Sequence, residues 1–92
     1  MELLTEDEIA VRLSAVPGWT REGNSISCAV TRDDFRGAML YAGAVAYLAE
    51  AVNHHPDIAI SWNQVTLTLS THSAGGLTAA DFALAGRISA LS

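Results

Sequence analysis

The segment IAISWNQVTLTLS, residues 58–70, carries the clearest structural pattern in this chain of 92 residues. Its second half, VTLTLS, alternates between apolar and hydroxyl-bearing residues, which is the period of a strand with one buried face. Its first half, IAISW, alternates between larger and smaller residues in the same way. Asn63-Gln64 separates the two halves and favours a short turn. The segment therefore predicts a β-hairpin with one apolar and one polar face.

A long helix is predicted before this hairpin, over residues 33–53. Thr31 followed by Asp34 three residues later is typical of a helix start. Pro56 ends the helix because its ring cannot continue the backbone hydrogen bonds. One stripe of apolar side chains repeats at helical spacing, and we expect it to be the buried face. The stripe comprises Tyr41, Val45, Leu48 and Val52.

Further large apolar residues of this helix lie off the stripe. They are Phe35, Met39, Leu40 and Tyr47. A helix that is apolar on more than one side of so small a protein needs a second surface to cover it. We therefore expect a homo-oligomer. Scattered exposed apolar residues, which are normal on protein surfaces, are the alternative.

Three shorter elements are predicted before the long helix. Thr5 followed by Glu8 is a capping-box pattern that begins a helix, and Pro17-Gly18 ends it. Residues 19–22 and 25–30 then read as two strands. The Gly-Asn pair between them favours a hairpin turn.

A last helix is predicted after the residue 58–70 hairpin, because Thr78 is followed by Asp81 three residues later. The element order is then α-β-β-α-β-β-α. Hairpins supply antiparallel strand pairs, and strands with one polar side accept helices on one face only. We therefore predict an α+β two-layer sandwich, a four-stranded antiparallel sheet with helices on one face. A single domain is expected to span residues 1–92.

The composition excludes several classes of partner. A formal net charge of -5 argues against direct contact with nucleic acid or an anionic membrane. The longest uncharged run, residues 37–49, is shorter than the roughly 20 residues of a membrane span, and the first residues are acidic where a secretory signal is basic. The single cysteine, Cys28, shares the parity of apolar neighbours and is expected to face the core. It fits a reducing compartment, so a cytoplasmic protein is expected.

Three histidines point to the chemistry. His54 and His55 lie at the C-terminal end of the long helix, and His72 lies at the end of the last strand. Histidine is the residue type that exchanges protons near neutral pH. A helix end and a strand end can meet at one edge of a sheet, and the parity of the strand places His72 on the uncovered polar face. The pattern indicates a shared acid–base site.

Other interpretations of these residues are less specific. A histidine before proline often only caps helix carbonyls. Adjacent histidines point in different directions and no cysteine or HxxxH pair accompanies them, so no metal is expected. No nucleophile elbow and no glycine-rich phosphate loop are present, so no cofactor is expected either. Trp19 and Trp62 are typical of core residues.

The spacing of several of these residues resembles the signature of the pterin-4a-carbinolamine dehydratases. The matching positions are Glu50, His54-His55-Pro56, Trp62, His72 and Asp81, with Pro17-Gly18-Trp19 and Ser70-Thr71-His72 as flanking agreement. The resemblance spans roughly residues 3–91. Two departures stand out: Ile58 follows Asp57 where many relatives have an aromatic residue, and residues 73–75 differ from the commoner version.

The resemblance implies a hydro-lyase that converts 4a-hydroxytetrahydropterin to quinonoid dihydropterin and water, in the recycling of tetrahydrobiopterin. The 4a-hydroxyl leaves as water while a ring nitrogen loses a proton. One general acid and one general base are enough for this reaction, without a metal or a covalent intermediate. Family members are dimers or tetramers, so we expect a homodimer or homotetramer.

The resemblance also implies roles for individual residues. His54 and His72 would be the acid–base pair, and His55 would help to hold the pterin and move protons. The implied substrate-binding residues are His54, His55, Pro56, Thr71, His72, Ser73 and Ala74, and the implied supporting residues are Glu50, Trp62 and Asp81.

Two other functions stay open at this point. Some relatives are dimerisation cofactors of a homeodomain transcription factor, which would make the chain a protein-interaction module. A related heterocycle, as in molybdopterin metabolism, is a third possibility. The intact set of three histidines favours catalysis, because a scaffold has no need of it.

Overall fold

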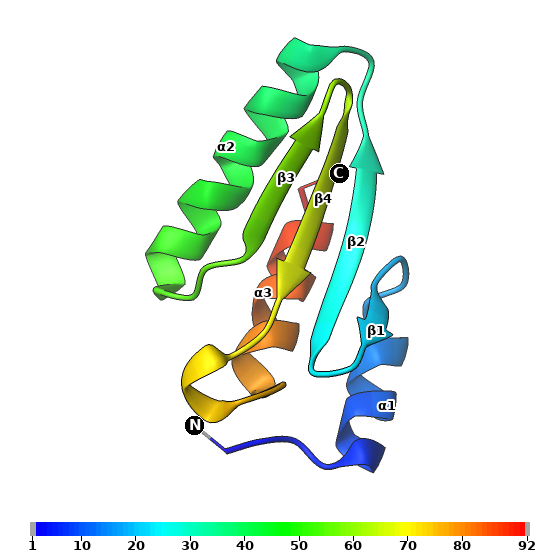
Figure 1. Cartoon of the computed structure of the whole chain (residues 1–92), viewed down its shortest axis with the longest axis vertical. Helices are drawn as coiled ribbons and strands as arrows, with labels where there is room; N and C mark the ends of the chain where they lie inside the picture. The colour runs from blue at the N-terminus through cyan, green and yellow to red at the C-terminus, as the bar shows by residue number, and fades with distance from the viewer. Residues whose placement is uncertain (1, 92) are drawn as a thin grey trace.

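The structure, a computed structural model, describes residues 2–91 and follows the predicted element order (Figure 1). Met1 and Ser92, the ends of the expected domain, lie outside the described residues. The elements are α1 (Glu6–Ser14), β1 (Thr20–Glu22), β2 (Ser25–Thr31), α2 (Phe35–Val52), β3 (Asp57–Ser61), β4 (Gln64–Leu69), the short 3-10 helix η1 (His72–Ala74) and α3 (Ala79–Ser89).

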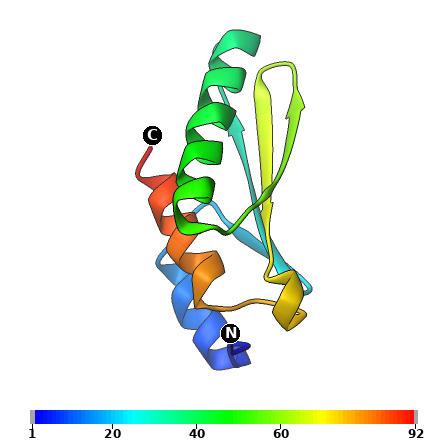
Figure 2. The same cartoon turned by 90° about the vertical axis from the view of Figure 1, so that its left-hand side faces the viewer.

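The four strands form one antiparallel sheet in the order β1-β2-β4-β3. The helices pack on one face of this sheet and leave the other face open, as Figure 2 shows. The predicted α+β sandwich is therefore confirmed. Among the described residues, no helix is both long enough and apolar enough to cross a membrane.

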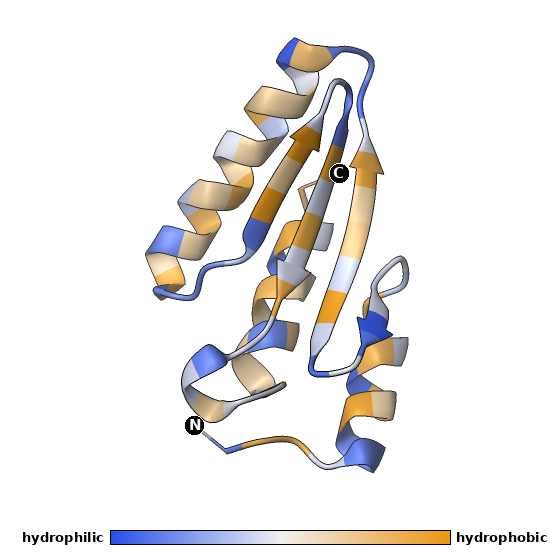
Figure 3. Ribbon diagram, in the orientation of Figure 1, coloured by the Kyte–Doolittle hydropathy of each residue, from blue (hydrophilic) through white to orange (hydrophobic). Residues whose placement is uncertain are grey.

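The core lies between β4 and the helices. Along β4 apolar and polar residues alternate (Figure 3), and Val65, Leu67 and Leu69 are completely buried. Burial of each of these side chains stabilises the fold by roughly 1.5–3 kcal/mol. The buried residues that face them from α3 are Phe82, Leu84, Ala85 and Ile88. The alternation read from the sequence thus defines the buried face of the sheet.

The buried face of α2 differs slightly from the predicted stripe. Its buried residues are Ala38, Tyr41, Ala42, Val45 and Ala49. Leu48 packs against this core, whereas Val52 is 41 % exposed. By its helical angle Val52 lies on the same side as Tyr41 and Val45, but it is the last residue of α2. The four apolar residues off the stripe are all exposed: Phe35, Met39, Leu40 and Tyr47.

The ends of α2 also differ from the prediction. Its N-cap is Asp34, whose carboxylate accepts a hydrogen bond from the Gly37 N–H at 2.7 Å. Thr31 instead ends β2, because pairing with β4 holds it in the sheet. The helix ends through a left-handed residue, Asn53, three positions before Pro56. The predicted capping boxes of α1 and α3 are both confirmed.

Trp62 is neither a strand residue nor a core residue. Ser61 pairs with Gln64, so Trp62 and Asn63 form the turn, one position earlier than predicted. Trp62 has a φ of 51°, in the left-handed region, and its side chain is 67 % exposed. The prediction of a buried Trp62 is therefore wrong.

The sheet register explains this turn. It places Ile60 opposite Val65, which keeps both on the buried face, and a slip by one residue would expose every apolar side chain of the strand. The turn is also tied to the chain before α2. The Asn63 side-chain amide donates to the Arg32 carbonyl at 3.0 Å, and the Arg32 N–H donates to the Asn63 carbonyl at 2.8 Å.

Candidate functional site

His54 is placed by the way α2 ends. The Asn53 N–H donates to the Glu50 carbonyl at 3.2 Å, and the His54 N–H donates to the Ala49 carbonyl at 3.1 Å. With Asn53 left-handed at φ 50°, these two bonds make a Schellman motif. The chain therefore leaves the helix axis at His54. Its side chain is only 13 % exposed.

Asp81 is the buried centre of a polar network. Its Oδ1 lies 2.6 Å from His54 Nε2, and its Oδ2 accepts hydrogen bonds from the Thr71 hydroxyl at 2.8 Å and the Thr78 N–H at 2.9 Å. The side chain of Asp81 is completely buried. An ionised carboxylate can only accept hydrogen bonds, so the proton of the Asp81–His54 contact belongs to Nε2. Among residues 2–91, no hydrogen bond engages Nδ1 of His54.

Thr71 connects this network to His72. The Thr71 N–H donates to the Gly76 carbonyl at 2.9 Å, and Gly75, at φ 79°, takes the left-handed conformation that closes the short loop. Thr71 is buried against Asp81, whereas the next residue, His72, is exposed. Asp81 thus holds the segment after α2, through His54, and the segment after β4, through Thr71, next to each other.

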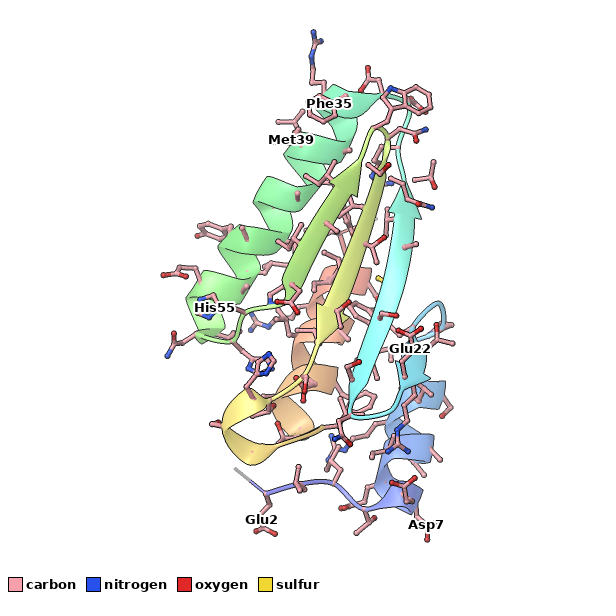
Figure 4. All side chains as sticks on the ribbon, in the orientation of Figure 1. Glu2, Asp7, Glu22, Phe35, Met39 and His55 are labelled. Carbon is pink, nitrogen blue, oxygen red and sulfur yellow. The ribbon has the colours of Figure 1, made fainter. Side chains whose placement is uncertain are left out.

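His55 lies on the surface beside the same helix end (Figure 4). Its Nε2 is 2.8 Å from Glu50 Oε2, and both side chains are mostly exposed. Exposed pairs of this kind contribute about 0–1 kcal/mol to stability. The contact with Glu50 therefore orients the imidazole more than it stabilises the fold.

His72 and His54 border two different hollows. His72 lines a polar hollow of about 270 Å³ on the open face of the sheet, together with Asn24, Ser25, Asp57, Thr68 and Ser70. His72 does not end the strand as predicted, because β4 ends at Leu69 and His72 begins η1, but it lines this hollow beside Thr68 and Ser70 as expected. His54 lines a second hollow of about 230 Å³ between α2 and α3, with Val52, Asn53, Ala80, Ala83, Leu84 and Arg87.

Most of the remaining predicted site residues lie in the segments next to the histidines, and one lies at the far end of the sheet. Ser73 is exposed and Ala74 is half-buried in η1, and Pro56 is half-buried before β3. Trp62 lies in the β3–β4 turn, at the opposite end of β4 from His72, so within the chain it does not join the histidines. Asp57 also lines the hollow beside His72, although the sequence pattern did not single it out.

Cys28 is the one nucleophilic thiol of the chain. It is partly buried and packs against the core, as predicted. Burial raises the pKa of this thiol from 9.0 to about 11, so it is protonated at neutral pH and a poor nucleophile. Among residues 2–91, no three His, Cys, Asp or Glu side chains are grouped closely enough to hold a metal ion.

The family model and similar known proteins point to the same family. The family model described as Pterin 4 alpha carbinolamine dehydratase matches residues 2–91. A protein of Mycobacteroides abscessus is 52% identical over 88 residues, which cover 96% of this chain and 94% of the relative. A protein of Nocardia farcinica is 50% identical over 90 residues, covering 98% and 95%. Both relatives are provisionally named pterin-4-alpha-carbinolamine dehydratases.

Two solved structures resemble this fold. A Brucella melitensis protein described as a transcriptional coactivator/pterin dehydratase has a TM-score of 0.92 and 33% identity, and the match covers 97% of each chain. A pterin dehydratase-like protein described as a RuBisCO assembly factor in the alpha-carboxysome has a TM-score of 0.64 and 23% identity, covering 79% of this chain and 84% of the other. The second likeness concerns the fold alone.

Proposed function

Because this chain belongs to the pterin 4 alpha carbinolamine dehydratase family, we propose that it dehydrates 4a-hydroxytetrahydropterin to quinonoid dihydropterin. This hydro-lyase reaction would serve the recycling of tetrahydrobiopterin. The observation that carries the proposal is the Asp81 network, which holds His54 on one oxygen and the residue before His72 on the other. It supports an acid–base site built from the ends of α2 and β4.

The reaction needs two proton transfers. The C4a–O bond breaks, and the departing hydroxyl takes a proton from a general acid and leaves as water. A ring nitrogen gives its proton to a general base, and its electron pair forms the new C=N bond. We assign these transfers to His54 and His72, with His55 as the assisting residue. Acid–base help of this kind is typically worth about 10²–10⁴-fold.

The contacts of His54 suit a proton-transfer residue. With Nε2 hydrogen-bonded to Asp81, one tautomer is selected and Nδ1 is left to exchange a proton with the substrate. A buried carboxylate also stabilises the imidazolium that forms during transfer. We propose the same orienting role for Glu50 toward His55, at the surface.

The proposed substrate contacts come from the two segments next to the histidines. Pro56 on one side, and Thr71, Ser73 and Ala74 on the other, would line the pterin through backbone groups and small side chains. The Thr71 hydroxyl is engaged with Asp81, so its contribution would come from its backbone. Trp62 is not part of this proposal, because it lies at the other end of β4.

A dehydration assay tests the proposal. An aromatic amino acid hydroxylase generates the 4a-hydroxypterin, and quinonoid dihydropterin is followed by absorbance with and without the protein. We expect acceleration by the wild type, and losses of about 10²-fold or more in His54→Ala and His72→Ala. Circular dichroism confirms that the variants fold. A wild-type protein that never accelerates the reaction would refute the proposal.

A homodimer or homotetramer is proposed as the working form, in the cytoplasm. The exposed apolar residues of α2 support association, and the lone Cys28 fits a reducing compartment. The same α2 surface is the observation that favours a second candidate, a protein-interaction module. The Brucella melitensis relative is described by both roles. The dehydration assay separates the two candidates, because an interaction module alone would not accelerate the reaction.

A further inference from the structure

The polar hollow beside His72 contains a carboxylate that the proposed mechanism does not use. Asp57 is the first residue of β3 and pairs with Thr68 of β4, so both side chains lie on the open face of the sheet. The hollow has a volume of about 270 Å³, slightly below the roughly 300–1,000 Å³ of sites for drug-sized ligands. It therefore has room for a small heterocycle.

Two of the hydroxyl groups that line this hollow are already engaged, and Asp57 is the one carboxylate among the lining residues. The Ser70 hydroxyl already donates to the Asn24 carbonyl at 2.9 Å, and the Ser25 hydroxyl donates to the Glu22 carbonyl at 3.0 Å. Among residues 2–91, no hydrogen bond or ion pair engages the side chains of the other lining residues, which are Asn24, Asp57, Thr68 and His72. The strongest acceptor facing the hollow is therefore the Asp57 carboxylate.

A carboxylate in such a place selects its ligand by charge and by geometry. It repels anions and accepts two parallel N–H groups through its two oxygens, as in carboxylate–arginine pairs. The pyrimidine edge of a pterin presents such a pair, the N3–H and the 2-amino group. The polar hollow therefore suits the N3–H and 2-amino edge of the pterin, which lies away from the C4a–O bond that breaks.

We propose that Asp57 binds the N3–H and 2-amino edge of the pterin and so determines specificity for 2-amino-4-oxo pteridines, an inference that rests on the proposed function. Asp57 follows His55 by two residues, so their Cα atoms lie at most about 7 Å apart. His72 lines the same hollow. A bicyclic ring held at Asp57 by one edge would lie beside His72, in the hollow that both residues line, and next to the chain segment that carries His54 and His55.

Binding of two fluorescent ligands tests this role. Pterin carries the 2-amino group, and lumazine carries an oxygen in its place, which an Asp57 carboxylate would repel. We expect the wild type to prefer pterin. In Asp57→Asn, pterin should bind roughly 10-fold to 100-fold more weakly, the range for loss of hydrogen bonds to a charged group. The preference should fall or reverse, because the asparagine amide can donate to the 2-oxo group.

Two further variants sharpen the comparison. Asp57→Glu retains a carboxylate and should keep most of the preference for pterin. Asp33→Asn makes the same change of charge in the exposed segment before α2, at the other end of the sheet, and should change neither ligand's affinity. In the dehydration assay, Asp57→Asn should raise KM more than it lowers kcat, whereas His72→Ala should mainly lower kcat.

The outcomes separate the two proposals. If the wild type binds pterin and accelerates dehydration but Asp57→Asn keeps the same affinity and preference, the role of Asp57 is refuted and the proposed function stands. If the wild type neither binds pterin nor accelerates dehydration, both proposals fall. A loss of preference in Asp33→Asn as large as in Asp57→Asn would also refute the site, because net charge alone would then explain the effect.

Discussion

At the scale of single residues, Asp81 combines a structural and a chemical task. It caps α3 through the Thr78 N–H, and it holds His54 and Thr71 in a completely buried position. Removal of a buried partner leaves donors unsatisfied, which costs more than the net value of the bonds themselves. Stability and site geometry are therefore coupled at this residue.

We predict that Asp81→Ala lowers the free energy of unfolding by about 2–4 kcal/mol, because three buried donors lose their acceptor. Urea unfolding followed by circular dichroism measures this loss. Asp7→Ala, which removes an exposed acid from the first turn of α1, is the matched control and should change stability little. Equal free energies of unfolding for the two variants would show that the Asp81 hydrogen bonds do not stabilise the fold.

Cys28 gives a prediction about reactivity. Burial raises its pKa from 9.0 to about 11, so at pH 8 the thiolate fraction is about 100-fold lower than that of an ordinary cysteine. Iodoacetamide should therefore label the native protein about 100-fold more slowly than the urea-unfolded protein. Mass spectrometry measures both rates. Equal rates would mean that the thiol is not shielded.

The same shift of pKa makes stability depend on pH. The native state prefers the neutral thiol, so this contribution is complete below pH 9 and is lost as the pH rises through about 11. Burial also raises the pKa of Tyr41, which acts in the same direction. We expect the urea midpoint to fall between pH 9 and 11, and to fall less in Cys28→Ala. An identical decline in both proteins would assign the effect to other groups.

At the scale of elements, the end of α2 is the decisive local structure, because the left-handed Asn53 directs His54 toward Asp81. Asparagine tolerates this conformation, whereas a β-branched residue does not. The site therefore depends on backbone geometry next to it as well as on the histidine itself.

We predict that Asn53→Val destabilises the protein by about 1–2 kcal/mol and lowers the dehydration rate, because the left-handed backbone is strained and His54 moves. Asn53→Gly accepts the same φ and should keep both stability and rate close to those of the wild type. Thermal unfolding and the dehydration assay provide the two readouts. Similar behaviour of the two variants would contradict this account of the helix end.

At the scale of the whole molecule, α2 exposes several large apolar side chains. Phe35, Met39, Leu40 and Tyr47 are all exposed, whereas the buried residues of the helix are Ala38, Tyr41, Ala42, Val45 and Ala49. Exposed apolar groupings of this kind mark interaction surfaces in soluble proteins.

We predict a homodimer or homotetramer in light scattering at micromolar concentration. Leu40→Glu should reduce the measured mass, because a charge would be buried in the contact. Val11→Glu is the matched control, since Val11 on α1 is 70% exposed, as is Leu40. A monomeric wild type, or an equal effect of both variants, would contradict association through α2.

Much of this structure follows from neighbours along the chain. Capping boxes, strand alternation and the turn residues act over two to four positions, so the elements, their order and the buried face of β4 could be read directly. The three histidines could be named in the same way, from residue type and position.

The tertiary structure determined what long-range pairing controls. Pairing with β4 made Thr31 a strand residue and moved Trp62 into the turn. Asp81 bonds His54 across 27 positions and Thr71 across 10, and the polar hollow joins Asp57 to His72 across two strands. No local pattern encodes these contacts, because each depends on the register of strands and the packing of helices that only the folded chain brings together.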